Sequence, residues 1–156
     1  MASRSSNPRE REPGPRHQAR EAAVQVLYAL DSIKSPDEGD TERALAAYWA
    51  NLEGPAPGRP YCDEAVRGVM KIRAALDESI RAANSAWRVE RMARVDRNVI
   101  RLAAWEMLHT KDVPPEVAID EAVELARKFG TEDSPAFVNG TLDKVASMNK
   151  LVTRNR

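Results

Sequence analysis

The 156-residue chain contains a single cysteine, Cys62, and only two histidines, His17 and His109. One thiol cannot form an internal disulfide, and one thiol with two distant histidines does not give a recognisable metal-ligand spacing. This cysteine usage is typical of a reducing compartment, so we expect a cytoplasmic location. We also predict that the protein holds no metal and no cofactor.

The sequence also lacks long apolar runs and catalytic motifs. No stretch is apolar enough to cross a bilayer, and residues 1–20 contain no apolar signal-peptide core. No glycine-rich loop follows a strand, and no paired His or Cys motif occurs. Neither histidine has an evident catalytic neighbour, and Cys62 is typical of a small buried hydrophobe. We therefore expect no catalytic residues, and a protein that is not an enzyme.

Most of the chain shows the periodicity of amphipathic helices. Apolar residues recur at three- and four-residue spacing in segments at about 16–31, 41–53, 61–83, 96–108, 115–129 and 134–145. The third of these can be one helix or two, and a short helical turn is expected near residues 87–93. Because no strand alternation and no internal repeat occurs, we predict an all-α fold. The segment 96–108 is apolar around most of its circumference and should be the central, most buried helix.

Prolines and capping residues mark the expected ends of these helices. Pro115 and Pro135 stand at helix starts, where a missing N–H costs nothing. Asp96 and Ser134 are expected as N-caps, and Gly130 as the C′ residue that ends a helix.

Three positions inside the predicted helices need a special explanation. Gly68 and Gly140 each cost about 1 kcal/mol relative to Ala, so we expect close helix–helix approach at both. Glu106 projects from the apolar side of the central helix. We interpret it as a core carboxylate paired with an arginine rather than as a catalytic acid.

The net charge is zero, but the charges lie in blocks. Residues 1–20 and 65–111 have an excess of basic side chains, whereas 31–64 and 112–149 have an excess of acidic ones. Solvated helix faces would explain this alternation. A basic surface for a polyanion beside an acidic surface for a basic protein would explain it equally well.

Polar and charged residues dominate both ends of the chain. We expect a flexible basic arm over residues 1–15, a single helical domain over 16–150, and a short basic tail over 151–156.

Three segments carry a resemblance to a known family: AREAAVQVLYALD at 19–31, VDRNVIRLAAWEML at 95–108, and DVPPEVAIDEAVELARKFGTEDSPAFVNGTLDKV at 112–145. They resemble the NusB (N-utilization substance B) family of bacterial transcription antitermination factors. The resemblance implies an all-α bundle of about six to seven helices in two packed subbundles. It also implies a non-catalytic adaptor that, with the ribosomal protein NusE, binds the boxA element of nascent ribosomal RNA leaders or phage transcripts. Such adaptors act with RNA polymerase and other Nus factors to resist termination, and some members form homodimers that hide the RNA surface.

The resemblance also implies which residues bind RNA and the protein partner. The Arg-rich RNA-binding segment of the family corresponds here to RHQAR, which assigns RNA binding to Arg16, His17, Gln18 and Arg20. Relatives often carry three consecutive Arg where this chain has Arg-His-Gln, and the arm offers compensating charge at Arg4, Arg9 and Arg11. The NusE-binding residues are expected to be Glu132, Asp133 and Phe137.

Two other interpretations remain open at this point. The same helical module occurs as the recognition domain of ribosomal RNA cytosine methyltransferases, so the chain could be a stand-alone relative of that domain. It could also be a protein-binding helical scaffold, with a basic N-terminus that only solubilises it. On the helical wheel alone, Phe137 fits an aromatic at the edge of the core better than a partner anchor, and only the resemblance favours the anchor.

Overall fold

The computed structural model describes residues 14–86 and 88–154, which form seven α-helices and one 3₁₀ turn and contain no strand. The elements are α1 (Pro15–Leu30), α2 (Glu38–Ala50), α3 (Arg59–Lys71), α4 (Arg73–Ala83), η2 (Val89–Arg91), α5 (Arg94–His109), α6 (Pro115–Phe129) and α7 (Ser134–Met148). The predicted all-α fold is confirmed. None of these helices is long and apolar enough to cross a membrane.

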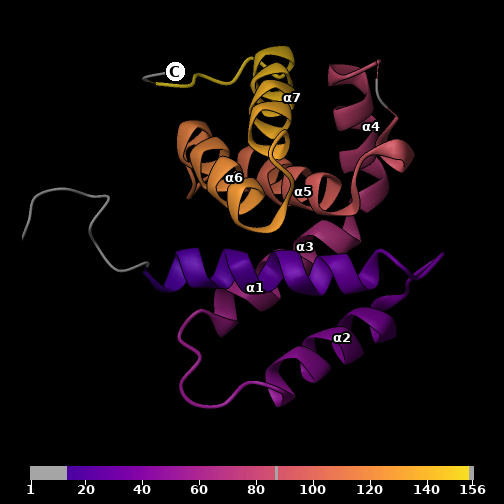
Figure 1. The fold of residues 1–156 in the computed structure, drawn as a ribbon, viewed down its shortest axis with the longest axis vertical. Helices are drawn as coiled ribbons and strands as arrows, with labels where there is room; N and C mark the ends of the chain where they lie inside the picture. Colours follow the sequence, from indigo (N-terminus) through magenta and orange to yellow (C-terminus); the bar gives the residue numbers. More distant parts are fainter. Residues whose placement is uncertain (1–13, 87, 155–156) are drawn as a thin grey trace, which may run out of the picture.

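The helices form two packed groups, as Figure 1 shows. Helices α1, α2 and α3 pack on one another, and α4, α5, α6 and α7 form the second group, in which α6 and α7 pack as a pair. Helix α5 joins the groups because it contacts α1 and α3 as well as α4, α6 and α7. The predicted arrangement in two subbundles is therefore confirmed.

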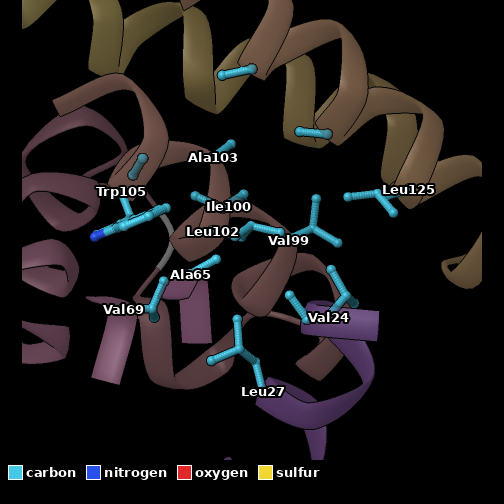
Figure 2. Close-up of a cluster of buried hydrophobic side chains, with 14 of the residues drawn as sticks. Val24, Leu27, Ala65, Val69, Val99, Ile100, Leu102, Ala103, Trp105 and Leu125 are labelled. Atoms are coloured by element: carbon cyan, nitrogen blue, oxygen red, sulfur yellow. The ribbon is translucent and has the colours of Figure 1, made fainter. Parts of the chain in front are cut away.

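Helix α5 is the central element, as its sequence predicts. Eleven of its residues are buried, from Asp96 to Met107. Figure 2 shows side chains of Val99 and Leu102 between those of α1, such as Leu27, and Leu125 of α6. Each large apolar side chain buried in this way contributes about 1.5–3 kcal/mol. The core thus lies around one helix that both subbundles share.

The N-terminus of α2 differs from its prediction. The helix starts at Glu38 rather than near residue 41, with Asp37 as its N-cap. The Asp40 N–H donates to Asp37 Oδ1 at 2.8 Å, and the Asp37 N–H donates to Asp40 Oδ2 at 2.9 Å. This reciprocal capping box satisfies two free backbone donors. It was missed because the first turn is polar and contains Gly39, which the sequence pattern placed in a loop.

Three predicted caps are wrong in detail. Asp96 lies inside the first turn of α5 and is buried, and Ser134 is the first helical residue of α7 rather than its cap. The Ser134 hydroxyl instead accepts a hydrogen bond from the Thr131 N–H at 2.9 Å. Gly130 ends α6 as predicted, but it is the C-cap residue rather than C′ and has an extended backbone, with φ −98° and ψ −162°. It is Gly because a Cβ there would lie 2.4 Å from Ser134 Oγ and 2.7 Å from the Ala126 carbonyl oxygen.

The segment 61–83 forms two helices, since the backbone leaves helical geometry at Ile72, with φ −123° and ψ 23°. Gly68 lies where α3 meets α5: a Cβ there would be 2.3 Å from Nε1 of Trp105. Close approach is therefore confirmed at Gly68. At Gly140 the prediction is wrong, because no described heavy atom beyond its chain neighbours and the adjacent backbone of α7 lies within 4 Å of the corresponding Cβ position.

Parts of three predictions lie outside the described residues. Residues 1–13 make up most of the predicted arm, and Trp87 is the first residue of the predicted short turn. Pro15 belongs to α1 rather than to the arm. In the tail, residues 151–154 are described and have no helical structure, whereas 155–156 are not described.

Candidate functional site

The first turn of α1 presents two of the residues predicted to bind RNA. Gly14 precedes the helix in an extended conformation and Pro15 opens it, so Arg16 and Gln18 follow at once and are both exposed. The Arg16 guanidinium carbon lies 4.4 Å from the centroid of the Tyr61 ring. No carboxylate within residues 14–86 or 88–154 forms an ion pair with Arg16. Its N–H donors are therefore not committed to a carboxylate in this part of the chain.

Arg20, one turn further along, lies in a different environment. It is 4% exposed, and its Nε donates to both oxygens of Glu106, at 3.1 and 3.0 Å. A terminal nitrogen lies 2.9 Å from the same carboxylate, and the Tyr61 hydroxyl donates to it as well. The sequence interpretation of Glu106 as a core carboxylate paired with an arginine is confirmed.

Burial and the neighbouring Glu106 set the protonation states of Arg20 and Tyr61. Burial alone would lower the pKa of Arg20, but the hydrogen bond and charge of Glu106 outweigh it and raise that pKa. Burial, followed by the nearby Glu106 charge, raises the pKa of Tyr61. Arg20 therefore stays a cation and Tyr61 stays a neutral hydrogen-bond donor at physiological pH.

His17 connects the first turn of α1 to α6. Its Nδ1 lies 2.8 Å from Glu121 Oε2 and its Nε2 lies 3.2 Å from Glu21 Oε1, with the ring partly buried. Lys128, near the end of α6, donates to the second oxygen of Glu21 at 2.8 Å. His17 and Arg20 thus tie the helix to its neighbours, whereas Arg16 is exposed and forms no ion pair in the described part of the chain. Whether any of the four contacts RNA stays a prediction.

A second ionic cluster lies at the opposite end of α1. Asp31 accepts hydrogen bonds from Arg97 Nε and Arg101 Nη1, each at 2.9 Å, and Arg94 Nε lies 3.4 Å from it. Arg101 also donates to both oxygens of Asp77 on α4, at 2.8 and 2.9 Å. Burial would raise the pKa of Asp31, but the hydrogen bonds from Arg97 and Arg101 outweigh it and lower that pKa.

This cluster explains part of the basic block at residues 65–111. Arg97 and Arg101 are used inside the fold, and Arg81 bridges Glu78 and Glu90 at the surface. The basic surface predicted from charge alone is therefore smaller than the sequence count suggests. Arg88, which precedes η2, and Arg91, its last residue, are exposed.

The predicted partner residues lie at the turn between α6 and α7 and in the first turn of α7. Glu132 and Asp133 are exposed, and Phe137 is half-buried and packed against the core. A surface hollow of about 660 Å³ adjoins them and is lined by Val123, Arg127, Glu132, Pro135 and Asn139 among others. The structure thus places the acidic turn, through Glu132, at the edge of a concave surface, with Phe137 packed against the core in the first turn of α7.

Cys62 is fully buried and free. Burial, reinforced by the nearby Asp63 charge, raises the pKa of the thiol to about 12. A protonated, inaccessible thiol is neither a nucleophile nor a ready metal ligand.

Sequence reasoning missed Tyr61. The sequence pattern gave it no role beyond that of a neighbour of Cys62, yet its ring lies under Arg16 and its hydroxyl meets Glu106. The only signal in the sequence was its place in the first turn of the third helical segment. Nothing local indicates that this turn would face α1 and α5.

Three comparisons with known proteins give the same family. The model of the NusB family matches residues 17–147. A transcription antitermination protein NusB from Sorangium cellulosum is 49% identical over 143 residues, which is 92% of this chain and 99% of that protein. The structure of T. maritima NusB superposes with a TM-score of 0.74 at 34% identity, covering 87% of this chain and 93% of that one.

A further solved structure shares the fold at 24% identity, with a TM-score of 0.70 over 86% of this chain and 97% of that one. It is a crystal structure of antitermination factors NusB and NusE in complex with double-stranded RNA.

Proposed function

The chain belongs to the NusB family of transcription antitermination factors, which are RNA-binding adaptors rather than enzymes, and we propose that it binds the boxA element of nascent ribosomal RNA leaders. The observation that carries this proposal is the first turn of α1, where Arg16 and Gln18 are exposed. Arg16 has N–H donors available for phosphate oxygens.

The proposed RNA is single-stranded, because unpaired bases present the edges and faces that side chains can recognise. Phosphate contacts would give affinity and register, and base contacts would give sequence preference. In this proposal His17 and Arg20 belong to the same segment but act mainly by holding it on α5 and α6, since both are engaged with carboxylates. Few exposed cations are available in the described part of this segment, so RNA binding by the chain alone should be weak.

The proposed protein partner is NusE, at the turn that carries Glu132, Asp133 and Phe137. Exposed acidic side chains suit a basic ribosomal protein, and the half-buried Phe137 ring, one turn further along the chain, offers an aromatic contact. NusE would add RNA contacts that the chain lacks and connect the complex, acting in the cytoplasm, to RNA polymerase and the other Nus factors. Homodimers in which the RNA surface is covered would compete with this assembly.

Titration of boxA RNA with and without purified NusE tests the proposed function. We expect weak binding by the chain alone and clearly tighter binding in the presence of NusE, with a mutated boxA sequence bound less well. Binding of NusE without any RNA binding would favour the protein-binding scaffold. Equal binding of boxA and of unrelated ribosomal RNA, unaffected by NusE, would favour the recognition module related to methyltransferases.

Replacing Phe137 with Ala tests the partner surface. We expect a loss of about 2 kcal/mol or more in NusE affinity, as for an aromatic hot spot. The loss in folding free energy should be smaller than the roughly 3–5 kcal/mol of a fully buried Phe. Phe129→Ala, at the other Phe of the chain and also packed against the core, is the matched control. Normal NusE affinity with a collapsed thermal melt in Phe137→Ala would make Phe137 a core residue only.

A further inference from the structure

Arg16 lies on the ring of Tyr61, which is held in place by hydrogen bonding to the buried Glu106–Arg20 pair. Its guanidinium carbon is 4.4 Å from the Tyr61 ring centroid, a distance at which a cation is attracted to the ring face. The Tyr61 hydroxyl donates to Glu106, which is 1% exposed. Glu106 is itself held by Arg20, whose guanidinium carbon lies 5.8 Å from the same ring. One end of the ring is thus anchored in the core and its face is presented to Arg16.

This arrangement restricts a side chain that is normally mobile. An exposed arginine loses much of its rotamer freedom when it binds, which lowers its affinity for a ligand. Contact with the Tyr61 ring takes up one side of Arg16 while leaving the side chain exposed. An arginine plane held in this way can stack with an unpaired base, and its N–H groups can reach a neighbouring phosphate.

We propose that Tyr61 is a positioning residue for RNA: it holds Arg16 as a platform on which one unpaired base of single-stranded RNA stacks, and the Glu106–Arg20 pair fixes the ring. The inference rests on the proposed RNA-binding function. It adds a residue of α3 to the RNA site and gives Arg20 a role behind the site rather than at the phosphates.

The substitution that separates stacking from charge is Arg16→Lys. Lysine keeps the positive charge but has no plane to stack. Affinity for single-stranded boxA RNA should therefore fall about tenfold, the lower range for the loss of one stacked base. The dependence of the logarithm of affinity on the logarithm of salt concentration should keep its slope, because the number of neutralised phosphates is the same. Wild-type RNA affinity in Arg16→Lys would overturn the proposal. A flatter salt slope that accounts for the whole loss of affinity would overturn it as well.

Two substitutions of Tyr61 test the support itself. Tyr61→Leu removes the ring and should lower affinity about as much as Arg16→Lys, again without a change of slope. Tyr61→Phe keeps the ring, loses the bond to Glu106 and should have a smaller effect. The double variant Arg16→Lys, Tyr61→Leu should bind RNA only slightly more weakly than either single variant, because each substitution removes the same stacking interaction. Additive losses would make Tyr61 a purely structural residue. Should Tyr61→Leu fail to fold, Tyr61→Phe and Arg16→Lys carry the test.

RNA variants complete the experiment. An abasic nucleotide at the stacked position should weaken binding to the wild-type chain and make no further difference to Arg16→Lys. Equal losses for both proteins at every abasic position would overturn the platform while leaving RNA binding intact. No measurable RNA binding by the unaltered chain, with or without NusE, would overturn the proposed function and the platform with it.

Discussion

The two ends of α1 use arginine in opposite ways. At the C-terminal end, the Asp31 carboxylate accepts hydrogen bonds from Arg97 and Arg101. These two guanidinium groups are therefore paired inside the fold. At the N-terminal end, Glu106 accepts hydrogen bonds from Arg20 and from the Tyr61 hydroxyl. Arg16, one turn away, contacts the Tyr61 ring and forms no ion pair within the described part of the chain. Pairing and burial, rather than residue type, therefore decide which arginine stabilises the protein and which can bind a ligand.

The largest effect is expected from breaking the buried pair at the N-terminal end. Glu106→Ala leaves Arg20 buried without its carboxylate, which should cost about 3–5 kcal/mol of unfolding free energy. Urea denaturation measures the loss. The matched control is Glu42→Ala, which removes a carboxylate that pairs with Arg67 at 2.7 Å on the exposed surface. Its loss should be far smaller, because solvent screens exposed pairs. Comparable losses in both variants would remove the distinction between buried and exposed arginines.

The corresponding change at the C-terminal end is Asp31→Asn. The amide keeps the shape but offers Arg97 and Arg101 a neutral acceptor, so we expect a loss of about 2 kcal/mol at neutral pH, within the range for hydrogen bonds to charged groups. RNA affinity should not change, because this cluster lies at the far end of α1. A selective loss of RNA affinity in a fully folded Asp31→Asn variant would contradict the assignment of this end to stability.

The ion pairs of Asp31 also make the stability of the protein depend on pH. The pKa of Asp31 is lowered in the folded protein from its ordinary value of 3.8. The carboxylate therefore contributes stability that is fully present well above pH 3.8 and is lost as the pH falls below that value. Unfolding measured from pH 6 to pH 2 should show wild type losing its advantage over Asp31→Asn at the acidic end. A constant difference between the two proteins across this range would count against the ion pairs.

A smaller pair of effects comes from the two glycines inside helices. Gly68 supports the packing of α3, which carries Tyr61, on α5, and a Cβ there would lie 2.3 Å from Trp105 Nε1. Gly68→Ala should therefore cost roughly 1–3 kcal/mol by overpacking. Gly140→Ala meets open space and should stabilise by up to about 1 kcal/mol through helix propensity. Thermal melts of the two variants should shift in opposite directions, and shifts of the same sign would contradict this account.

Much of the fold follows from the sequence, because helical periodicity is a local property. It located the helices, identified α5 as central, and assigned Glu106 to the core with an arginine partner. It could not name that partner, since Arg20 is 86 positions away. For the same reason, a motif that groups Arg16 with Arg20 does not show that Arg16 is exposed whereas Arg20 is buried.

Helix ends were the weaker part of the prediction. The capping box at Asp37 and Asp40 and the hydroxyl of Ser134 involve polar side chains whose partners depend on local backbone geometry. Several residues near each helix end satisfy the capping preferences, so the sequence pattern alone does not identify which one is the cap. Tyr61 was missed because its contacts join α3 to α1 and α5, which local patterns do not connect.

The most direct test of the account is the salt dependence of boxA RNA binding by the intact chain and by Arg16→Gln. Each phosphate contact in a single strand contributes about 0.7 to the slope of log affinity against log salt concentration. We predict that Arg16→Gln flattens the slope by about that amount and weakens binding. Arg43→Gln, at an exposed arginine of α2, should leave both unchanged. An unchanged slope in Arg16→Gln, or an equal change in Arg43→Gln, would contradict the claim that the N-terminal end of α1 binds RNA.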